Sequence, residues 1–593
     1  MSEDQKNPAG DHIGAPEAKT SGNAVSRSSG NAVSRSTGSR GSRVSGSSVS
    51  GSKGSNSSGS GSSPRSSKGR SSKKGVITGV LSAVVILAAG GGAVAATSMV
   101  PEPSGGTTMD VRQADVPAGR ALGVCPEPAR LVNGTVVGTD ADFSPVSTTA
   151  NSALNAVVLS NPAGTVPGSS VESLGGDLVA RIAETPTSTP TPTVGPPVLA
   201  AGVASVSPAT SPAVVGADAL GNEQASLAAN LSYSATDGDL RGLASTQCQA
   251  PGNDAWLLGA NTAVGRTAVL NLSNASETPA TVNLELFGYS GQIQAPGARG
   301  LLVAPGTTRS VNLAGLAPGE SQLAVHVRST GGPVAPTIQQ SVLRGIAPGG
   351  VEYLSPGAGP SNLQVMSGVD IQDPAGVKAL SAKSGFADAV PALQIAVPGS
   401  TDAVVQISLY GANGERKLPN GGVLTVKGGT VATLNLDGVP AGTYTVKATS
   451  DVSFLASARV TRGSKAEAAT DFAWSPSSAR LGSQHLVALP RDGQRFLSLG
   501  VPEGRGTVTY APVTADGKVG KAVDVDMSGG TTSLIELPEK SGGSVVAGYV
   551  VSASGDPMYG AVVLGKQDRP DVSVVAIQDA AAGLQKVPVS VGY

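Results

Sequence analysis

Few side chains in this sequence could act as a nucleophile, a general base or a metal ligand. The 593 residues include three histidines and two cysteines, and they contain neither a G-x-S-x-G elbow nor a P-loop. His326 and His485 each stand alone in strand-like or loop contexts, so we expect ordinary surface or half-buried imidazoles. Spacing alone does not exclude a nucleophile–His–acid triad around them. The sequence predicts no catalytic residue, no metal site and no cofactor.

Two short segments are similar to functional motifs but have simpler interpretations. The segment 288–291, Gly-Tyr-Ser-Gly, is one residue away from a serine-hydrolase elbow and predicts a hairpin turn. The segment 237–242, Asp-Gly-Asp-Leu-Arg-Gly, begins like a calcium loop. Because Arg241 occupies a position that would need a ligand, a plain turn is predicted there.

Sugar chemistry would need stacking aromatics or paired carboxylates. Trp256, Tyr289 and Trp474 could stack on a sugar ring, but we expect each of them to pack in the core. The carboxylate pair of a glycosidase depends on scaffold geometry, which the sequence does not show.

Cys125 and Cys248 are the only cysteines, and their pairing depends on the compartment. No C-x-x-C motif is present, and a tetrahedral metal site would need further ligands. In an oxidising space the pair would close a long loop and stabilise the fold by about 4–5 kcal/mol in the chain-entropy model. We predict a disulfide, and the alternative is two free buried thiols.

A charge-free apolar run near the N-terminus indicates in which compartment the two cysteines lie. Residues 76–100 carry no charge, Lys73 and Lys74 precede them, and Glu102 follows. About 20 helical residues cross a bilayer, so we predict a transmembrane helix over 75–100 with the lipid bilayer as its partner. The positive-inside rule makes the N-terminus cytoplasmic and the C-terminal region extracellular, in a single-pass protein of the cell membrane. The alternative is a signal peptide cleaved near residues 93–95.

Residues 1–74 predict a disordered Ser/Gly/Arg-rich cytoplasmic tail. From Ser21 to Ser72, 23 of 52 residues are Ser, and the octapeptide SGNAVSRS occurs twice in tandem. Such a composition buries too little apolar surface to offset chain entropy. The tail is interpreted as a flexible spacer, and the alternative is a regulated tail that binds anionic lipid and is released by phosphorylation.

Charge and composition limit what the remaining chain does. Residues 1–75 hold twelve Lys/Arg and four Asp/Glu, which leaves a net charge of −9 on the rest. Since nucleic-acid binding needs basic side chains, no nucleic-acid partner is predicted. Gly and Pro make up about a fifth of the chain and charged residues 14%, which disfavours a mostly helical protein.

The exported part divides into a stalk, a first β-rich region and three similar modules. Residues 101–121 predict the stalk, and residues 122–250 predict a β-rich region with a Thr/Pro-rich loop at 184–215, closed by the disulfide. The loop must be extended, because proline fixes φ, and such segments can be O-glycosylated.

The three modules are predicted at 251–350, 351–470 and 471–593. Each has alternating apolar residues, a turn at Gly291, Gly414 or Gly517, and then two further apolar runs. Short strands with frequent turns at about 100 residues per unit predict an all-β protein of tandem immunoglobulin-like β-sandwich modules. The alternative is a β-propeller, whose blades repeat at shorter intervals.

The overall plan resembles a family of uncharacterised exported actinobacterial proteins. The resemblance covers roughly residues 75–593, and it is carried by Cys125 with Pro126 and by Cys248 leading into Asp254-Ala255-Trp256-Leu257-Leu258-Gly259. Such proteins are described only as a domain of unknown function and are associated with envelope glycosyltransferases. The resemblance implies an envelope role and transfers no catalytic residue.

Together these features predict a non-enzymatic, membrane-anchored cell-envelope protein. Its β-modules would adhere to wall glycan or serve as a scaffold for a partner such as the glycosyltransferase machinery. One alternative is a carbohydrate-active enzyme or accessory subunit of polysaccharide assembly. Another is a sensor with a phosphorylatable tail.

Overall fold

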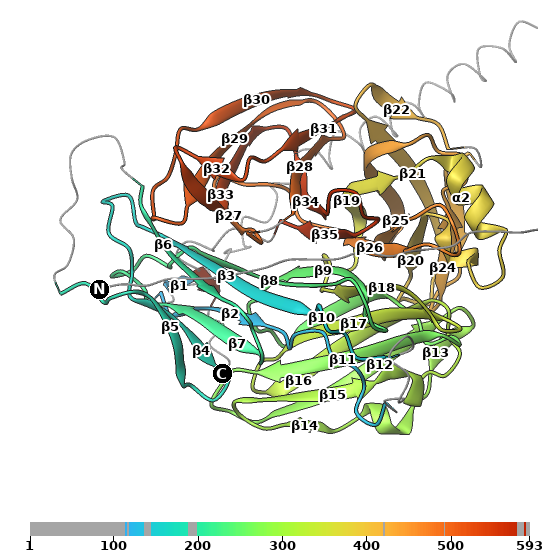
Figure 1. Ribbon diagram of the computed structural model, residues 1–593, viewed down its shortest axis with the longest axis horizontal. Helices are drawn as coiled ribbons and strands as arrows, with labels where there is room; N and C mark the ends of the chain where they lie inside the picture. Colours follow the sequence, from blue (N-terminus) through green and yellow to red (C-terminus); the bar gives the residue numbers. More distant parts are fainter. Residues whose placement is uncertain are drawn as a thin grey trace, which may run out of the picture. The chain divides into compact units, whose positions relative to one another are not determined.

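The computed structural model describes residues 113–115, 118–135, 144–187, 199–418, 421–491, 493–577 and 586–588 (Figure 1). The predicted tail 1–74, the predicted span 75–100 and most of the predicted stalk 101–121 lie outside these residues. No helix within the described ranges is long and apolar enough to cross a bilayer.

Antiparallel strands are the main regular elements of the described chain, which confirms the all-β prediction. The strands fall into four consecutive groups, which we call sandwiches 1 to 4. Sandwich 1 contains β2 (Ala121–Cys125), β3 (Asn151–Leu159), β4 (Ser169–Ser173), β5 (Leu178–Ala183), β6 (Ala201–Val206), β7 (Ala213–Ala217), β8 (Leu227–Ala235) and β9 (Gly242–Gln247). Sandwich 2 contains β10 (Asp254–Ala260), β11 (Arg266–Asn274), β12 (Ala280–Gly288), β13 (Gly291–Ile293), β14 (Leu301–Val303), β15 (Thr307–Asn312), β16 (Leu323–Gly331), β17 (Ala335–Arg344) and β18 (Ala347–Leu354).

Sandwiches 3 and 4 complete the series. Sandwich 3 contains β19 (Ser361–Ile371), the helix α2 (Pro374–Ser381), β20 (Ala392–Ala396), β21 (Ala403–Gly411), β22 (Gly414–Arg416), β23 (Val423–Val426), β24 (Val431–Asn435), β25 (Gly442–Arg462) and β26 (Asp471–Pro476). Sandwich 4 contains β27 (His485–Ala488), β28 (Gln494–Val501), β29 (Arg505–Thr514), β30 (Val523–Ser528), β31 (Thr531–Glu536), β32 (Lys540–Ser541), β33 (Ser544–Gly555), β34 (Tyr559–Gly565) and β35 (Val572–Ala576).

One pairing order recurs in all four groups. Sandwich 1 has sheets ordered β2-β7-β4-β5 and β6-β3-β8-β9, and sandwich 2 has β10-β16-β12-β13 and β15-β11-β17-β18. Sandwich 4 has β27-β33-β29-β30 and β31-β28-β34-β35. Sequence analysis recognised three repeats and missed that the first β-rich region has the same order. Its strands are rich in Ala, Val and Ser, which obscured the repeat, although the β4–β5 hairpin has the equivalent turn at Gly176, with φ of 94°.

Sandwich 3 follows the same order with one long strand in place of two. The first half of the 21-residue β25 pairs with β19 and β21, and its second half pairs with β20 and β26. The sequence predicted strands of four to eight residues, and this element is a correction. Polar residues such as Ser450 and Asp451 interrupt its apolar alternation where the strand passes from one sheet to the other.

Each pair of sheets buries its facing side chains. In sandwich 2, Leu257 and Leu284 of one sheet and Leu270 and Ile338 of the other share one buried cluster. Burying such a side chain contributes about 1.5–3 kcal/mol, so the packed sheets account for the stability of each unit. A propeller blade is a single sheet, and no propeller is found in the described residues.

Two predicted boundaries need correction. The predicted loop 184–215 contains β6 and β7, because Ala, Gly and Val there suit a buried strand. Its residues 188–198 lie outside the described chain. Within the predicted stalk, β1 (Gln113–Asp115) pairs with β36 (Lys586–Pro588).

The predicted turns and the disulfide are present. Gly291 and Gly414 have φ of 130° and 99°, a region that favours glycine, and each begins the second strand of a hairpin. The structure joins Cys125, at the end of β2, to Cys248, after β9. The bridge therefore ties the first strand of sandwich 1 to its last.

The final strands of the four sandwiches contact one another in a closed cycle. β9 contacts β18, β18 contacts β26, β26 contacts β35, and β35 contacts β9 (Figure 1). Sandwich 1 is thereby a neighbour of sandwich 4 as well as of sandwich 2.

Candidate functional site

The two segments that are similar to functional motifs, 288–291 and 237–242, form turns as predicted. Residues 288–291 form the β12–β13 hairpin. Asp237 accepts hydrogen bonds from the backbone N–H groups of Thr148 and Thr149 and from three nearby hydroxyls, so it fixes a loop as a plain turn would. These hydrogen bonds lower the pKa of Asp237 below its usual range.

The aromatic candidates divide into two groups. Trp256 and Trp474 are buried, as expected, but Tyr289 is 71% exposed at the hairpin tip, which corrects the prediction that it packs in the core. A tip residue has no strand neighbour on either side to cover it.

The two histidines are more buried than predicted. His485 is 3% exposed and His326 is 8% exposed. The ring of His326 stacks on Trp256, with 3.9 Å between ring centroids. Its Nδ1 lies 2.7 Å from Glu285 Oε2 and its Nε2 lies 2.9 Å from Asp254 Oδ2. Both ring nitrogens are thus engaged by carboxylates, and no nucleophile completes a triad at this histidine in the described residues.

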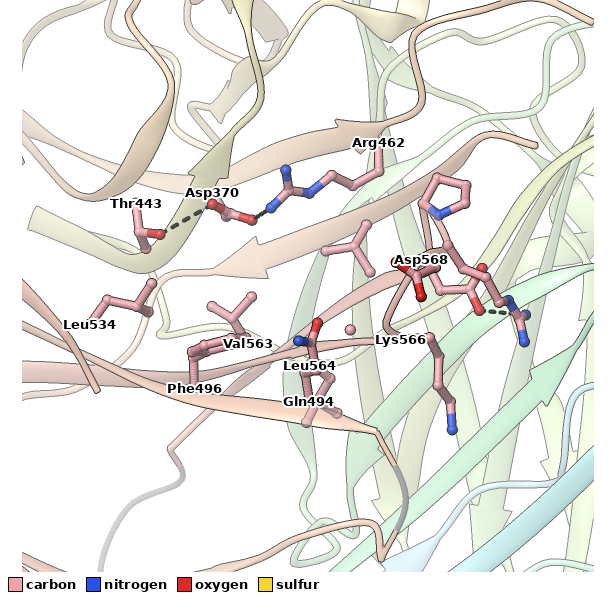
Figure 2. A pocket seen from close by; sticks show the side chains of 15 residues that line it. Asp370, Thr443, Arg462, Gln494, Phe496, Leu534, Val563, Leu564, Lys566 and Asp568 are labelled. Atoms are coloured by element: carbon pink, nitrogen blue, oxygen red, sulfur yellow. Dashed lines mark hydrogen bonds and ion pairs between the residues drawn. The ribbon is translucent and has the colours of Figure 1, made fainter. Parts of the chain in front are cut away.

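A cleft at the boundary of sandwiches 3 and 4 is the strongest candidate site (Figure 2). It has a volume of about 550 Å³, within the range of small-molecule sites. β19 and β25 of sandwich 3 form one wall, and β28, β31, β34 and the β34–β35 loop of sandwich 4 form the other.

The sandwich 3 wall is polar and ordered by its own contacts. Asp370 pairs with Arg462 and accepts a 3.1 Å hydrogen bond from Thr443 Oγ1. Figure 2 shows these three side chains in a row above the floor of the cleft. The guanidinium is 34% exposed, so Arg462 keeps donors available to a ligand.

The sandwich 4 wall carries the loop between β34 and β35. Arg569 pairs with Asp571 and donates a 3.1 Å hydrogen bond to the backbone oxygen of Ala235 in sandwich 1. Burial raises the pKa of Asp571, although nearby Arg569 opposes that effect. Asp568 has φ of 60° and is the one non-glycine residue of the described chain with positive φ. Such a conformation is uncommon and often marks functional loops.

Polar groups without partners lie over an apolar floor. The side chains of Gln494, Lys566 and Asp568 make no hydrogen bond or ion pair within the described part of the chain, and all three line the cleft. Phe496 is partly buried and Leu534 is 45% exposed beneath them. Free hydrogen-bonding groups beside an exposed apolar surface suit a ligand with hydroxyl or carboxylate groups and a hydrophobic ring face.

A second polar groove lies beside His326. Asn253, Asp254, Asn283, Glu285 and Arg328 are among the residues that line it. Its carboxylates already bond His326, and Asn253 and Asn283 are held by Ser329 and Gly300. Because its polar groups are largely satisfied, it is a weaker candidate than the cleft.

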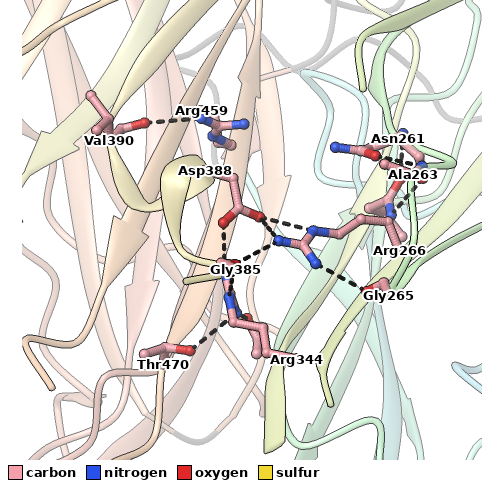
Figure 3. A network of polar contacts seen from close by, with 12 residues as sticks. Asn261, Ala263, Gly265, Arg266, Arg344, Gly385, Asp388, Val390, Arg459 and Thr470 are labelled. Atoms are coloured by element: carbon pink, nitrogen blue, oxygen red, sulfur yellow. Dashed lines mark hydrogen bonds and ion pairs between the residues drawn. The ribbon is translucent and has the colours of Figure 1, made fainter. Parts of the chain in front are cut away.

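The boundary of sandwiches 2 and 3 holds a charged network instead of a cleft (Figure 3). Asp388 Oδ2 lies 2.6 Å from Arg266 Nη2, and Asp388 Oδ1 lies 2.9 Å from Arg344 Nη2. The carbonyl of Gly385 accepts from both guanidinium groups, and Arg459 donates to the carbonyl of Val390. Asp388 and the Gly385 carbonyl thus satisfy Arg266 and Arg344 and join the two sandwiches, whereas the buried Nε of Arg459 has no hydrogen-bond partner among the described residues.

Metal-ligating side chains do not gather in the described residues. No group of three or more His, Cys, Asp or Glu side chains there could hold a metal ion. The cleft combines paired charges, amide and ammonium groups and an apolar floor.

Sequence analysis missed the cleft residues. The segment 566–571, Lys-Gln-Asp-Arg-Pro-Asp, is unusually charged for this chain and follows an apolar strand. That contrast was the available signal, but only the fold brings the segment to Asp370 and Arg462.

The fold and site define a multi-sandwich β protein with a polar cleft between two of its units. Residues 203–538 match a family of unknown function, DUF5719. Because the match covers more than half of the chain, the protein belongs to that family. No curated protein and no solved structure shows significant similarity to the chain.

Proposed function

We propose that this protein is a non-enzymatic, membrane-anchored protein of the cell envelope that binds wall glycan in the cleft between sandwiches 3 and 4. The observation that carries this proposal is the set of partnerless polar side chains, Gln494, Lys566 and Asp568, over the surface of Phe496 and Leu534. The hydroxyl groups of a saccharide can hydrogen-bond to the polar side chains, and its C–H face can pack on the apolar surface.

The anchor and the topology belong to the same proposal. Residues 76–100 hold the chain in the bilayer, the tail 1–74 is cytoplasmic and the sandwiches are extracellular, next to the glycosyltransferase machinery of the envelope. The disulfide Cys125–Cys248 supports export, because such bonds persist in oxidising compartments. Protease added to intact cells should degrade the sandwiches and spare the tail, and both thiols should resist alkylation.

We also assign each sandwich to the immunoglobulin-like class. In each unit one sheet contains the pair β3–β6, β11–β15, β20–β24 or β28–β31, and the other contains β4–β7, β12–β16, β21–β25 or β29–β33, which correspond to the central pairs of that class. The first strand of each unit departs from that class, because it pairs with β7, β16, β25 or β33 in the second sheet. An experimental structure tests this assignment.

A binding measurement tests the function directly. Full-length protein in detergent micelles should bind purified wall glycan without releasing soluble fragments. Lys566→Ala should weaken binding roughly tenfold or more, the value of a hydrogen bond from a charged donor. Lys521→Ala is the matched control, since Lys521 is an exposed lysine of sandwich 4 away from the cleft. Equal binding by both variants contradicts the site, and released fragments would favour an enzyme.

A further inference from the structure

We propose that Glu352 and Asp471 form a carboxyl latch that closes the cycle of four sandwiches at low pH and loosens it as pH rises. The latch itself is independent of the proposed glycan function, and only its effect on the cleft rests on that function.

Both acids lie where the four final strands meet. Glu352 belongs to β18 and Asp471 to β26, and they are 0% and 2% exposed. β9 and β35, the strands that bring sandwich 1 against sandwich 4, each donate a hydrogen bond to both acids. Sandwiches 2 and 3 thus provide the acids, and sandwiches 1 and 4 provide the donors that reach across the junction.

Glu352 connects β9 to β35 through one oxygen. Its Oε1 accepts from the N–H of Ser245 at 3.3 Å and from the hydroxyl of Ser573 at 3.0 Å. The N–H of Tyr353 adds a third hydrogen bond at 2.9 Å. The hydroxyl of Ser573 also accepts from the N–H of Ser245 at 3.0 Å, which ties the two strands directly.

Asp471 repeats the arrangement on the same two strands. Its Oδ2 accepts from the N–H of Leu243 at 3.0 Å and from the N–H of Val572 at 3.1 Å. A Cβ atom at Gly242 or Gly350 would lie 2.8 or 2.3 Å from Asp471 Oδ1. Only glycine therefore allows the strands to approach the acid so closely.

The second oxygen of each acid indicates the neutral form. Glu352 Oε2 and Asp471 Oδ1 are buried and have no hydrogen-bond partner within the described residues. An ionised carboxylate with one bare, dehydrated oxygen is costly, whereas a protonated carboxyl is far less so.

The surrounding charges act in the same direction. Burial raises the pKa of Glu352 well above its usual range, and Asp471 raises it further. Burial likewise raises the pKa of Asp471, with Asp571 of β35 adding to the effect. The nearby cations Arg569, Arg241 and Lys566 lower the pKa of Asp571, against the effect of its burial. The adjacent phenol of Tyr353 is itself kept neutral by burial.

The sign of the pH dependence follows from these directions. Both folded-state pKa values lie above the unfolded ones, so the contribution of the latch is complete at low pH. It is lost as pH rises through the folded pKa values. Each carboxyl that ionises should reduce the closing equilibrium about tenfold per pH unit.

The latch also borders the cleft of Figure 2. Asp571 and Val572 line that cleft, and Val572 donates to Asp471. Release of β35 would displace one wall of the cleft, so ligand affinity should fall together with the closing equilibrium.

Amide hydrogen exchange of the full-length protein in detergent tests the latch. After correction for intrinsic rates, the amides of Leu243, Ser245 and Val572 should lose protection about tenfold or more per unit as pH rises above the usual carboxyl range. The double variant Glu352→Gln, Asp471→Asn retains neutral acceptors and should keep that protection. An identical pH dependence in both proteins would overturn the proposal.

An infrared measurement covers the case in which the double variant does not fold. The wild-type protein should retain a protonated-carboxyl band above the pH at which exposed carboxyls ionise, and this band should disappear as pH rises further. The absence of this band overturns the latch. A confirmed latch in a protein that binds no wall glycan would refute the proposed function alone.

Discussion

Two boundaries between neighbouring sandwiches contain similar residue types, but one boundary is filled by its own side chains and the other contains a cleft. The closed boundary, between sandwiches 2 and 3, pairs Asp388 with Arg266 and Arg344 and packs Trp256 against Leu455. The open boundary, between sandwiches 3 and 4, pairs Asp370 with Arg462 but leaves Lys566 without a hydrogen bond or ion pair to any described residue. Charged groups alone therefore do not mark a site in this fold. A better indicator of a ligand site is a polar side chain that makes no hydrogen bond or ion pair with the described residues.

The largest expected effect is at the apolar part of the closed boundary. Trp256→Ala removes a buried ring that stacks on His326 and lies 5.7 Å from Phe287. We expect a loss of about 3–5 kcal/mol in the free energy of unfolding, measured by chemical denaturation. Tyr289→Ala, which truncates an exposed aromatic ring of the same sandwich, should change it by less than about 0.5 kcal/mol. Similar losses in both variants would show that this boundary is not packed as described.

The charged part of the closed boundary should be nearly as sensitive. Asp388→Ala leaves Arg266 and Arg344 buried without their carboxylate. Breaking a buried pair in this way costs about 3 kcal/mol, again measured by denaturation. The exposed Asp437 of the same sandwich provides the control variant Asp437→Ala. An Asp388→Ala protein as stable as the control would make this boundary equivalent to the open one.

Acid should weaken the closed boundary in a way that separates it from the latch. Burial would raise the pKa of Asp388, but the charges of Arg344, Arg266 and Arg459 outweigh it and lower that pKa. Its stabilising contribution is therefore present above the unfolded pKa and lost as pH falls through the folded one. Limited proteolysis at decreasing pH should cut wild type at this boundary, and Asp388→Asn should show a weaker pH dependence. Cleavage that increases with pH instead would contradict the assignment.

The smallest effect on stability is expected in the cleft. Gln494→Ala and Lys566→Ala remove side chains that make no hydrogen bond or ion pair within the described chain, so the free energy of unfolding should change by no more than about 0.5 kcal/mol. Binding of wall glycan should nevertheless weaken. A variant that loses stability and binding together would show that the cleft is structural, like the closed boundary.

The sequence was sufficient for local structure and insufficient for assembly. The alternation in Ala280–Gly288 and the turns at Gly291 and Gly414 correctly predicted hairpins, because strand period and glycine conformation are local properties. The repeat in sandwich 1 escaped notice because its strands are rich in small residues, although Gly176 supplies the equivalent turn between β4 and β5. The cleft and the acids at the strand junction could not be predicted. Asp370 and Lys566, or Glu352 and Ser573, meet only through pairing orders that span hundreds of residues.

The closed cycle also has a consequence for how the chain is made. Ser245 and Ser573, which contact each other across the junction, are 328 residues apart in sequence. Because synthesis starts at the N-terminus, β9 is made long before β35. The side of β9 that contacts β35 stays uncovered until nearly the whole chain has been synthesised. Contacts of such long sequence separation form late and slowly, so ring completion should be the last folding event, and C-terminal truncations should be recognised by quality-control proteases.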